Sequence, residues 1–436
     1  MTALPTLTSL TNKKTIEDKI YAKVTWRLIP FLCLCYLCAY LDRVNVGFAK
    51  LQMLNDLQWS ETVYGLGAGI FFAGYVLVEV PSNILLQRVG AKRWIARIMV
   101  SWSLLSAATA FVTTPTMFYV VRFLLGVAEA GFLPGIILYL TYWYPASRRA
   151  KITALFYCAI PLSGVIGGPL SGWILSAFAG ASGLQGWQWL FILEATPSLL
   201  VGIAVLFILD DGIRQARWLT PTEKNILERN IQNETNHKLH HSITQALKDS
   251  RIWLLGLIYF SIAMGVYVFS FWLPTLIKDA GVKDVLNIGL LVAIPYFAGM
   301  VSMVFWARHS DKHQERRWHL AAAMVVGATG LSLSTLAANG IWMVLMALTF
   351  ASMGIQAMAP IFWSMPTALL GGSAAAVGIA LITSIGNIGG FTSTYLVGWI
   401  KDSTQSTNIG LYLVAGILVA GSIVTLVAVP AKLVNK

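Results

Sequence analysis

Long apolar runs, separated by polar connections, dominate the pattern of residues along the chain. A run of about 20 apolar residues is the length that a helix needs to cross the hydrocarbon core of a bilayer. The candidate spans are 26–47, 61–85, 94–113, 117–142, 152–178, 188–209, 252–273, 286–307, 319–338, 341–364, 374–399 and 409–429. The sequence therefore predicts an all-α integral membrane protein with twelve transmembrane helices.

One polar segment, 210–251, interrupts the spans at the middle of the chain and is rich in Lys, Glu, Asn and His. It separates a predicted six-helix bundle with its N-terminus, 1–209, from a second one with the C-terminus, 252–436. We expect a cytoplasmic linker with short amphipathic helices around 221–234. This layout is typical of membrane proteins whose two halves are related by an axis along the membrane normal.

Basic residues gather in alternate connections. Lys and Arg are frequent before the first span, after the second, fourth and eighth spans, and in the linker. The opposite connections carry only Lys50, Lys278, Lys283 and Lys401. Connections rich in Lys and Arg stay on the cytoplasmic side of a membrane. The pattern predicts a multi-pass protein of the inner or plasma membrane with both termini in the cytoplasm.

Composition agrees with a membrane protein and argues against several other classes. Hydrophobic residues make up 57% of the 436 residues and charged residues 11%, against about 25% charged in a soluble domain. The net charge of +12 could indicate nucleic-acid binding, but the basic residues follow the connections instead of clustering on a soluble domain. The cysteines lie within spans, so we expect free thiols and no metal site.

Signals of soluble enzymes are absent from the sequence. We find no phosphate-binding loop with its Lys and Ser/Thr, and the glycine runs do not follow a strand as a dinucleotide fingerprint would. We therefore expect neither enzyme activity nor a cofactor. An ATP-driven pump is disfavoured, which leaves an ion gradient, most simply of protons, as the energy source.

Four charged residues lie inside the apolar spans: Asp42, Arg43, Arg122 and Glu129. A charge at the bilayer centre costs about 2.5 kcal/mol or more, so such residues face a bundle interior or a wet cavity and mark pathways for substrates or protons. Arginines suit anions and carboxyl groups suit protons. The combination indicates a carrier that moves an organic acid together with H⁺.

The spacing of these four residues limits which pairs can form. Arg122 and Glu129 share a helix face but lie about 10 Å apart along the axis, so each needs another partner. Asp42 and Arg43 are adjacent and point about 100° apart. We expect Arg122 near Asp42, and Glu129 near Arg43 or the cavity. Protonation of one carboxyl would then free an arginine for a substrate carboxylate; a salt-bridge network that only fixes helix packing is the alternative.

Polar side chains in other spans complete the candidate site. The expected substrate-binding residues are Arg43, Arg122, Tyr40, Asn45, Tyr75, Gln356, Trp363 and Asn387. The amide of Asn387 lies in a glycine-rich span and needs a partner, whereas Trp363 could instead be an interfacial anchor. Glu79 is expected to pair with the basic connection that follows its span. Glu194 has no assigned role.

Two short basic turns occupy corresponding places in the two halves, one between the second and third spans and one between the eighth and ninth. We expect them to tie helix ends together and to stabilise one conformational state. The candidate gating residues are Arg88, Gly90, Lys92, Arg93, Asp311, Arg316 and Arg317.

Several motifs together carry a resemblance to a known family. They are LDRVNVG at 41–47, EVPSN at 79–83, RFLLGVAEAGFLPG at 122–135, SDK with ERR within 310–317, and GNIG at 386–389. With them the chain resembles the major facilitator superfamily and, within it, the anion:cation symporters. The resemblance implies a twelve-helix fold with a central cavity and alternating access. Such proteins carry tartrate, phthalate, sugar acids or hydroxyphenylacetate, usually with H⁺.

The resemblance also implies roles for individual residues. Asp42 and Glu129 would carry protons, Arg43 and Arg122 would be their partners, and one arginine would meet the substrate carboxylate. The cavity-lining residues implied in this way are Tyr40, Tyr75 and Asn387. Two features depart from the pattern: Gln87 stands where the superfamily has Asp, and the glycine-proline run 164–169 resembles a motif of antiporters.

The predicted function is proton-coupled uptake of an organic carboxylate by a monomer embedded in the bilayer. Its partners would be the small acid, H⁺ and lipid, with no nucleic acid. An efflux antiporter for an organic anion is one alternative. A membrane receptor on a carrier scaffold that does not transport is the other, although the chain carries no added signalling domain.

Overall fold

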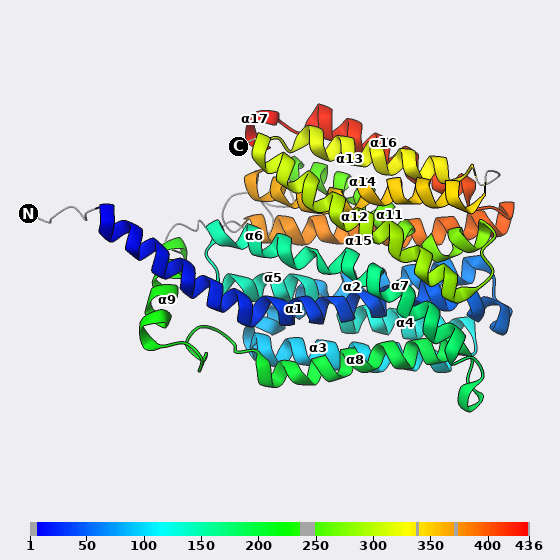
Figure 1. Cartoon of the computed structure of the whole chain (residues 1–436), viewed down its shortest axis with the longest axis horizontal. Helices are drawn as coiled ribbons and strands as arrows, with labels where there is room; N and C mark the ends of the chain where they lie inside the picture. The colour runs from blue at the N-terminus through cyan, green and yellow to red at the C-terminus, as the bar shows by residue number, and fades with distance from the viewer. Residues whose placement is uncertain (1–6, 236–248, 337–339, 370–373, 435–436) are drawn as a thin grey trace, which may run out of the picture.

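A computed structural model describes residues 7–235, 249–336, 340–369 and 374–434, and in these ranges helices joined by short connections form the whole fold (Figure 1). The first half contains α1 (Leu7–Leu57), α2 (Glu61–Val89), α3 (Ala91–Ala108), α4 (Pro115–Glu129), α5 (Phe132–Thr141), α6 (Ala146–Tyr157), α7 (Ala159–Ala177) and α8 (Gly186–Ile208). Helix α9 (Pro221–Thr235) follows, where the sequence predicts an amphipathic helix. The second half contains α11 (Ser250–Asp279), α12 (Val285–His313), α13 (Arg317–Ser334), α14 (Ile341–Leu369), α15 (Ala374–Thr404), α16 (Asn408–Ala428) and α17 (Ala431–Val434).

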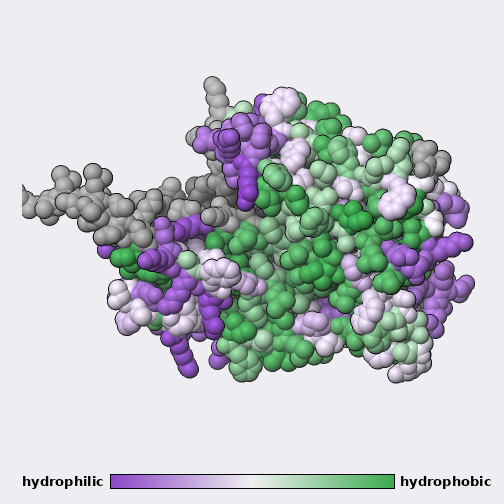
Figure 2. Space-filling view, viewed as in Figure 1, coloured by the Kyte–Doolittle hydropathy of each residue, from purple (hydrophilic) through white to green (hydrophobic). Residues whose placement is uncertain are grey.

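The predicted membrane architecture is confirmed in its class. Within the described residues, 10 helical segments are long and apolar enough to cross a membrane. The two remaining predicted spans belong to helices that are not among those 10. The span 319–338 follows α13 to its end at Ser334, with residues 337 and 338 outside the described part, and the span 374–399 lies on α15. Figure 2 shows an apolar band around the middle of the visible face, with hydrophilic residues at both ends. This is the distribution that a bilayer requires of the surface it surrounds.

Two of the predicted spans, 117–142 and 152–178, are broken helices; in the second, α6 ends at Tyr157 and α7 begins at Ala159. The span at 117–142 consists of α4 and α5, separated at Ala130 and Gly131, where Gly131 has a φ of 86°. The hydroxyl of Ser82 on α2 donates to the carbonyl of Ala130 at 2.7 Å and occupies the place that a Cβ on Gly131 would need. The break leaves Glu129 as the last residue of α4.

The two halves pack along long helices that lie side by side. Helix α1 packs on α11, α2 on α15, and α7 on α12. Within the first half, α2 packs on α4 and α3 on α8, while α13 packs on α14 and α16 in the second. Both termini and α9 lie at one end of the bundle, here the terminal end (Figure 1). The opposite end, where α1 joins α2 and α11 and α15 finish, is here the far end.

Candidate functional site

A buried ion pair between Arg43 of α1 and Glu129 of α4 lies at the centre of the candidate site. The Nε of Arg43 donates to Oε1 of Glu129 at 3.0 Å, and Nη2 contacts the same oxygen. The two side chains are 6% and 1% exposed. The structure therefore confirms the predicted approach of Glu129 to Arg43.

Aromatic rings surround the guanidinium of Arg43. Its central carbon lies 5.8 Å from the ring centre of Tyr40, 5.4 Å from that of Phe71 and 5.7 Å from that of Tyr75. Rings at this range attract a cation through their negative faces and keep water away from it. Tyr40 and Tyr75, both predicted site residues, thus belong to the surroundings of one arginine.

Residues of α11 and α12 bring the second half to the same place. Nη1 of Arg43 donates to the hydroxyl of Tyr267 at 3.4 Å, so the guanidinium contacts both halves. The hydroxyl of Tyr40 lies 3.1 Å from that of Ser270, which also receives a hydrogen bond from Tyr296 at 3.2 Å. The sequence analysis missed these three residues. Tyr267 and Ser270 share a face of α11, which is the signal that could have indicated them.

Asp42 faces away from this site, and the expected pairing with Arg122 is wrong. Its carboxylate accepts hydrogen bonds from Nε1 of Trp102 and Oγ of Ser106, both at 3.0 Å, and from Ser198. These donors belong to α3 and α8 of the same half. Adjacent helix residues point about 100° apart. Because Arg43 of α1 faces the other half, the adjacent Asp42 faces the interior of the first half.

Arg122 is fully buried and poorly paired. Its Nε donates to the carbonyl of Gly67 at 3.3 Å, and its guanidinium lies 5.3 Å from the ring centre of Phe71. Neither Nη1 nor Nη2 has a hydrogen-bond partner within the described part of the chain. A buried charge without partners is costly. The group is therefore a poor structural element and a good candidate for binding an anion.

Two further buried carboxyl groups lie near these residues. Glu79 receives a hydrogen bond at 3.5 Å from Ser384 of α15, so the expected pairing with the basic turn is wrong, because this face of α2 packs on the other half. Glu194, which the sequence analysis left unassigned, accepts a hydrogen bond from Ser171 at 2.6 Å. It lies close to Asn45, another predicted site residue.

Predicted site residues of the second half have other described neighbours than the ion pair. Asn387 is 8% exposed and lies one turn from Ser384, which contacts α2. Gln356 packs against Gly299 of α12, and Trp363 packs edge-on against Tyr259 with ring centres 4.9 Å apart. None of these side chains makes a described hydrogen bond to Arg43 or Glu129. Across the described ranges, no group of three or more His, Cys, Asp or Glu could hold a metal ion.

The first basic turn is tied to the end of α8. Gly90 has a φ of 98°, which favours glycine, and Asp211 occupies the place that a Cβ there would need. The backbone N–H of Lys92 donates to Oδ1 of Asp211 at 2.9 Å. Asp211 thus brings a carboxylate to the turn in which Gln87 replaces the familiar Asp. The side chains of Arg88 and Arg93 are exposed.

The second basic turn is tied to the end of α16. Arg316 forms an ion pair with Asp311 and donates to Oγ of Ser310 at 3.1 Å. Arg317 donates to the carbonyl of Val429 at 3.3 Å. Each turn therefore contacts the end of the last long helix of its own half. The matching contacts support a structural role for both turns.

Comparison with known proteins adds the family. The model of the Major Facilitator Superfamily matches residues 32–394. The chain is 51% identical to the "Putative metabolite transport protein NicT" of Pseudomonas putida, over 96% of each chain. It is 50% identical to a "Putative tartrate transporter" of Agrobacterium vitis, over 94% of this chain and 95% of that one.

A more distant relative and a solved structure are also similar over nearly the whole length. The "Quinolone resistance transporter" of Acinetobacter baumannii is 39% identical over 96% of each chain. The xylose transporter XylE from Escherichia coli, solved in a partially occluded inward-open conformation, has a TM-score of 0.74 at 14% identity. That match covers 93% of this chain and 98% of that one. At this identity the likeness concerns the fold alone.

Proposed function

The chain belongs to the Major Facilitator Superfamily, and from this premise we propose that it carries an organic carboxylate into the cell together with protons. It is a multi-pass membrane transporter of small molecules and not an enzyme. The proposal adds the coupling ion, the direction and the substrate class. A 50% identical relative named as a putative tartrate transporter supports the substrate class.

The observation that carries the proposal is the position of Arg43 between a carboxyl group and the other half. It bonds to Glu129 of its own half and to Tyr267 of the second. A guanidinium binds a carboxylate through two parallel hydrogen bonds. Protonation of Glu129 removes its negative charge and releases those donors. A substrate carboxylate can then take the place of Glu129, which makes proton and anion binding interdependent.

In the proposed cycle, Glu129 takes up a proton from outside and the anion binds to Arg43 between the halves. The halves then rock, and substrate and proton leave on the cytoplasmic side. Asp42 is proposed as a second proton carrier, because its partners are an indole N–H and two hydroxyls and include no cation. Arg122 is proposed as a second group for the anion.

We further propose that the terminal end faces the cytoplasm and that a single chain forms the whole pathway. The basic residues of the two turns and of α9 lie at that end, as the positive-inside rule requires of cytoplasmic segments. On this orientation the far end faces outside. The energy source is the proton gradient, without a cofactor.

Uptake of labelled tartrate and sugar acids into proteoliposomes, with and without an inward-directed proton gradient, tests the proposal. We expect gradient-dependent accumulation that a protonophore abolishes. Glu129→Gln should lose accumulation but keep counterflow exchange, because the neutral amide leaves Arg43 free for the anion. Full accumulation by this variant, or uptake that ignores the gradient, would contradict the role of Glu129.

Efflux of an organic anion is the second candidate function. The glycine-proline run 164–169 lies on α7, which packs against α12 of the other half. A 39% identical relative is named as a quinolone resistance transporter. The direction of flux at a fixed pH gradient distinguishes the two functions: efflux requires substrate to move against the inward flow of protons.

A further inference from the structure

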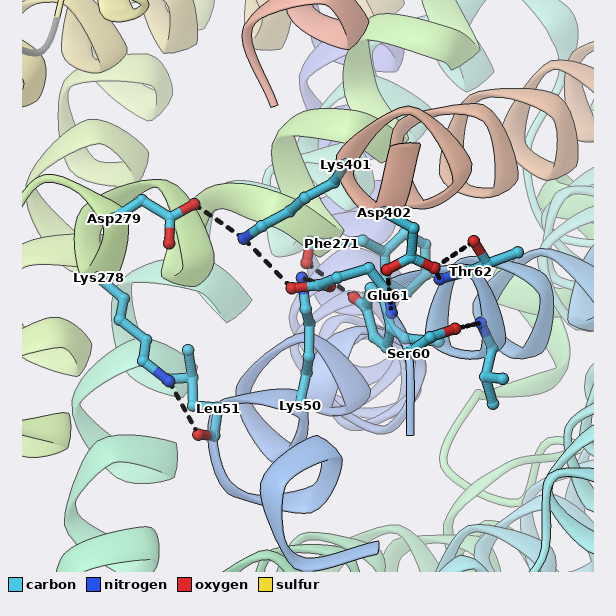
Figure 3. A network of polar contacts seen from close by, with 12 residues as sticks. Lys50, Leu51, Ser60, Glu61, Thr62, Phe271, Lys278, Asp279, Lys401 and Asp402 are labelled. Carbon is cyan, nitrogen blue, oxygen red and sulfur yellow. Dashed lines mark hydrogen bonds and ion pairs between the residues drawn. The ribbon is translucent and has the colours of Figure 1, made fainter. Parts of the chain in front are cut away.

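Three lysines converge on one cavity at the far end. The sequence places only four lysines on the external side, and Lys50, Lys278 and Lys401 all line a cavity of about 250 Å³ between α1, α2, α11 and α15 (Figure 3). Lys283 is not part of its lining. We call this cavity the outer vestibule. Charge-poor external connections thus concentrate most of their positive charge at a single site between the halves.

Two of these lysines are engaged by carboxylates. Lys50 lies 2.6 Å from Glu61 and 3.6 Å from the ring centre of Trp272. Lys401 of α15 bridges Glu61 of α2 at 3.2 Å and Asp279 of α11 at 2.9 Å. Lys50 and Glu61 belong to the first half and Lys401 and Asp279 to the second, so the Lys401–Glu61 pair crosses between the halves (Figure 3). The Lys401–Glu61 pair therefore links the external ends of the two halves.

Asp402 is occupied in a different way. Its carboxylate accepts the backbone N–H groups of Glu61 at 3.0 Å and of Thr62 at 2.7 Å, and it also contacts the hydroxyl of Thr62. It therefore caps the N-terminus of α2, where backbone donors and the helix dipole favour a negative charge. The charge of Asp402 is directed at α2 and leaves the vestibule lysines to Glu61 and Asp279.

Lys278 is the vestibule lysine for which the described residues provide no carboxylate partner. Its ammonium donates to the carbonyl of Leu51 at 3.2 Å, and no described carboxylate lies within ion-pair distance of it. One helical turn earlier, the hydroxyl of Thr275 is buried, lines the same cavity and has no hydrogen-bond partner among the described residues. An uncompensated ammonium and an unpaired hydroxyl are donors that suit a small hydroxylated carboxylate.

We propose that the outer vestibule captures the substrate carboxylate on the external side, before it reaches Arg43. The captured anion competes with Glu61 and Asp279 for Lys401 and so weakens the Lys401–Glu61 pair that links the external ends of the halves. This inference rests on the proposed orientation and substrate class. The vestibule would raise the local concentration of anion at the entrance, and its occupancy would favour opening toward it.

Occupancy of the vestibule can be measured without transport. Asn55 is exposed and lines the cavity, so Asn55→Cys in right-side-out vesicles reports access for a membrane-impermeant thiol reagent. We expect tartrate to slow the labelling, and threitol, which keeps the hydroxyls but lacks the carboxylates, to have no effect. Sodium chloride at matched ionic strength should not protect. Lys283→Cys, outside the cavity, is the control and should be labelled at the same rate with and without tartrate, threitol or sodium chloride.

A further substitution tests the role of Lys278. In the Asn55→Cys background, Lys278→Gln should raise the tartrate concentration needed for half-protection about fivefold, the upper range for one partly exposed ion pair. Lys278→Arg should retain protection. Absence of protection in the parent, equal protection by chloride, or an unchanged requirement in Lys278→Gln would overturn the inference. Proton-driven uptake by the parent is scored separately, so failure of the proposed function remains distinguishable.

Discussion

Arg43 joins three different interactions in one side chain. It bonds to a carboxylate, to a hydroxyl of the other half, and to the faces of surrounding aromatic rings. Because both Nε and Nη2 contact the same oxygen of Glu129, the planar fork of the guanidinium determines the geometry. A lysine has one ammonium on a flexible stem and cannot reproduce that fork.

We therefore expect Arg43→Lys to fail although it keeps the charge. A hydrogen bond to a charged group is worth about 1.5–3 kcal/mol, so the KM for uptake should rise about tenfold or more. Tyr267→Phe is the matched control: it removes one long hydrogen bond and should change KM only about threefold. Uptake kinetics in proteoliposomes give both values. Near-normal kinetics for Arg43→Lys would show that only charge matters at this position.

The sequence could predict that Glu129 meets Arg43 but not where Asp42 points. Helical spacing sets the angle between neighbouring side chains, whereas the rotation of the whole helix depends on how α1 packs against α3, α8 and α11. The donors around Asp42 lie at positions 102, 106 and 198, in spans that the sequence analysis did not link to it. Their contribution depends on tertiary packing, which a single sequence does not reveal.

At the scale of helices, some features follow from the local sequence and others depend on tertiary packing. Apolar length predicts where the spans lie, because the bilayer sets that requirement for each helix alone. The break between α4 and α5 occurs within an apolar run that contains Gly131 and Pro134. Pro134 has no N–H to donate to the carbonyl of Ala130, and the hydroxyl of Ser82 on another helix donates to that carbonyl instead. Similarly, α1 begins at Leu7 and not near residue 26, since the charged stretch before the span continues the helix.

The break offers a test of helix geometry. We expect Gly131→Ala to lower the melting temperature and to impair uptake, because its φ of 86° is strained for alanine and its Cβ would collide with Ser82. Gly180→Ala is the matched control, with a φ of 80° and nothing within 4 Å of the added carbon. Thermal unfolding in detergent compares the two variants.

The difference in stability loss between Gly131→Ala and Gly180→Ala separates the effect of packing from that of backbone strain. Backbone strain costs about 1–3 kcal/mol at either glycine. A larger loss for Gly131→Ala would assign the remainder to the contact between α2 and α4–α5. Equal losses would mean that the collision is relieved by movement of Ser82 and that the break is held by backbone geometry alone. Since Glu129 ends α4, only the former result connects the break to the ion pair.

At the scale of the whole molecule, two halves with separate interiors meet along α1, α2 and α7 on one side and α11, α15 and α12 on the other. Asp42 lies inside one half, Arg43 lies between the halves, and the ion pairs of the outer vestibule lie at the far end of the same interface. A change at any of these positions acts on a different part of the transport cycle. The vestibule pairs act on the balance between conformations.

The final prediction concerns that balance. Lys401→Gln removes the pair with Asp279 inside the second half and the pair with Glu61 between the halves. The latter, partly exposed, is worth up to about 1 kcal/mol, or about fivefold in population. Spin labels on Thr116 of α4 and Ser403 of α15, both exposed near the far end, report the separation of the halves there. We expect Lys401→Gln to broaden the distance distribution toward longer values, whereas Lys401→Arg, which keeps the charge, and Lys283→Gln, outside the vestibule, should not. An unchanged distribution in Lys401→Gln would mean that helix packing of α2 on α15 closes the far end without help from these ion pairs.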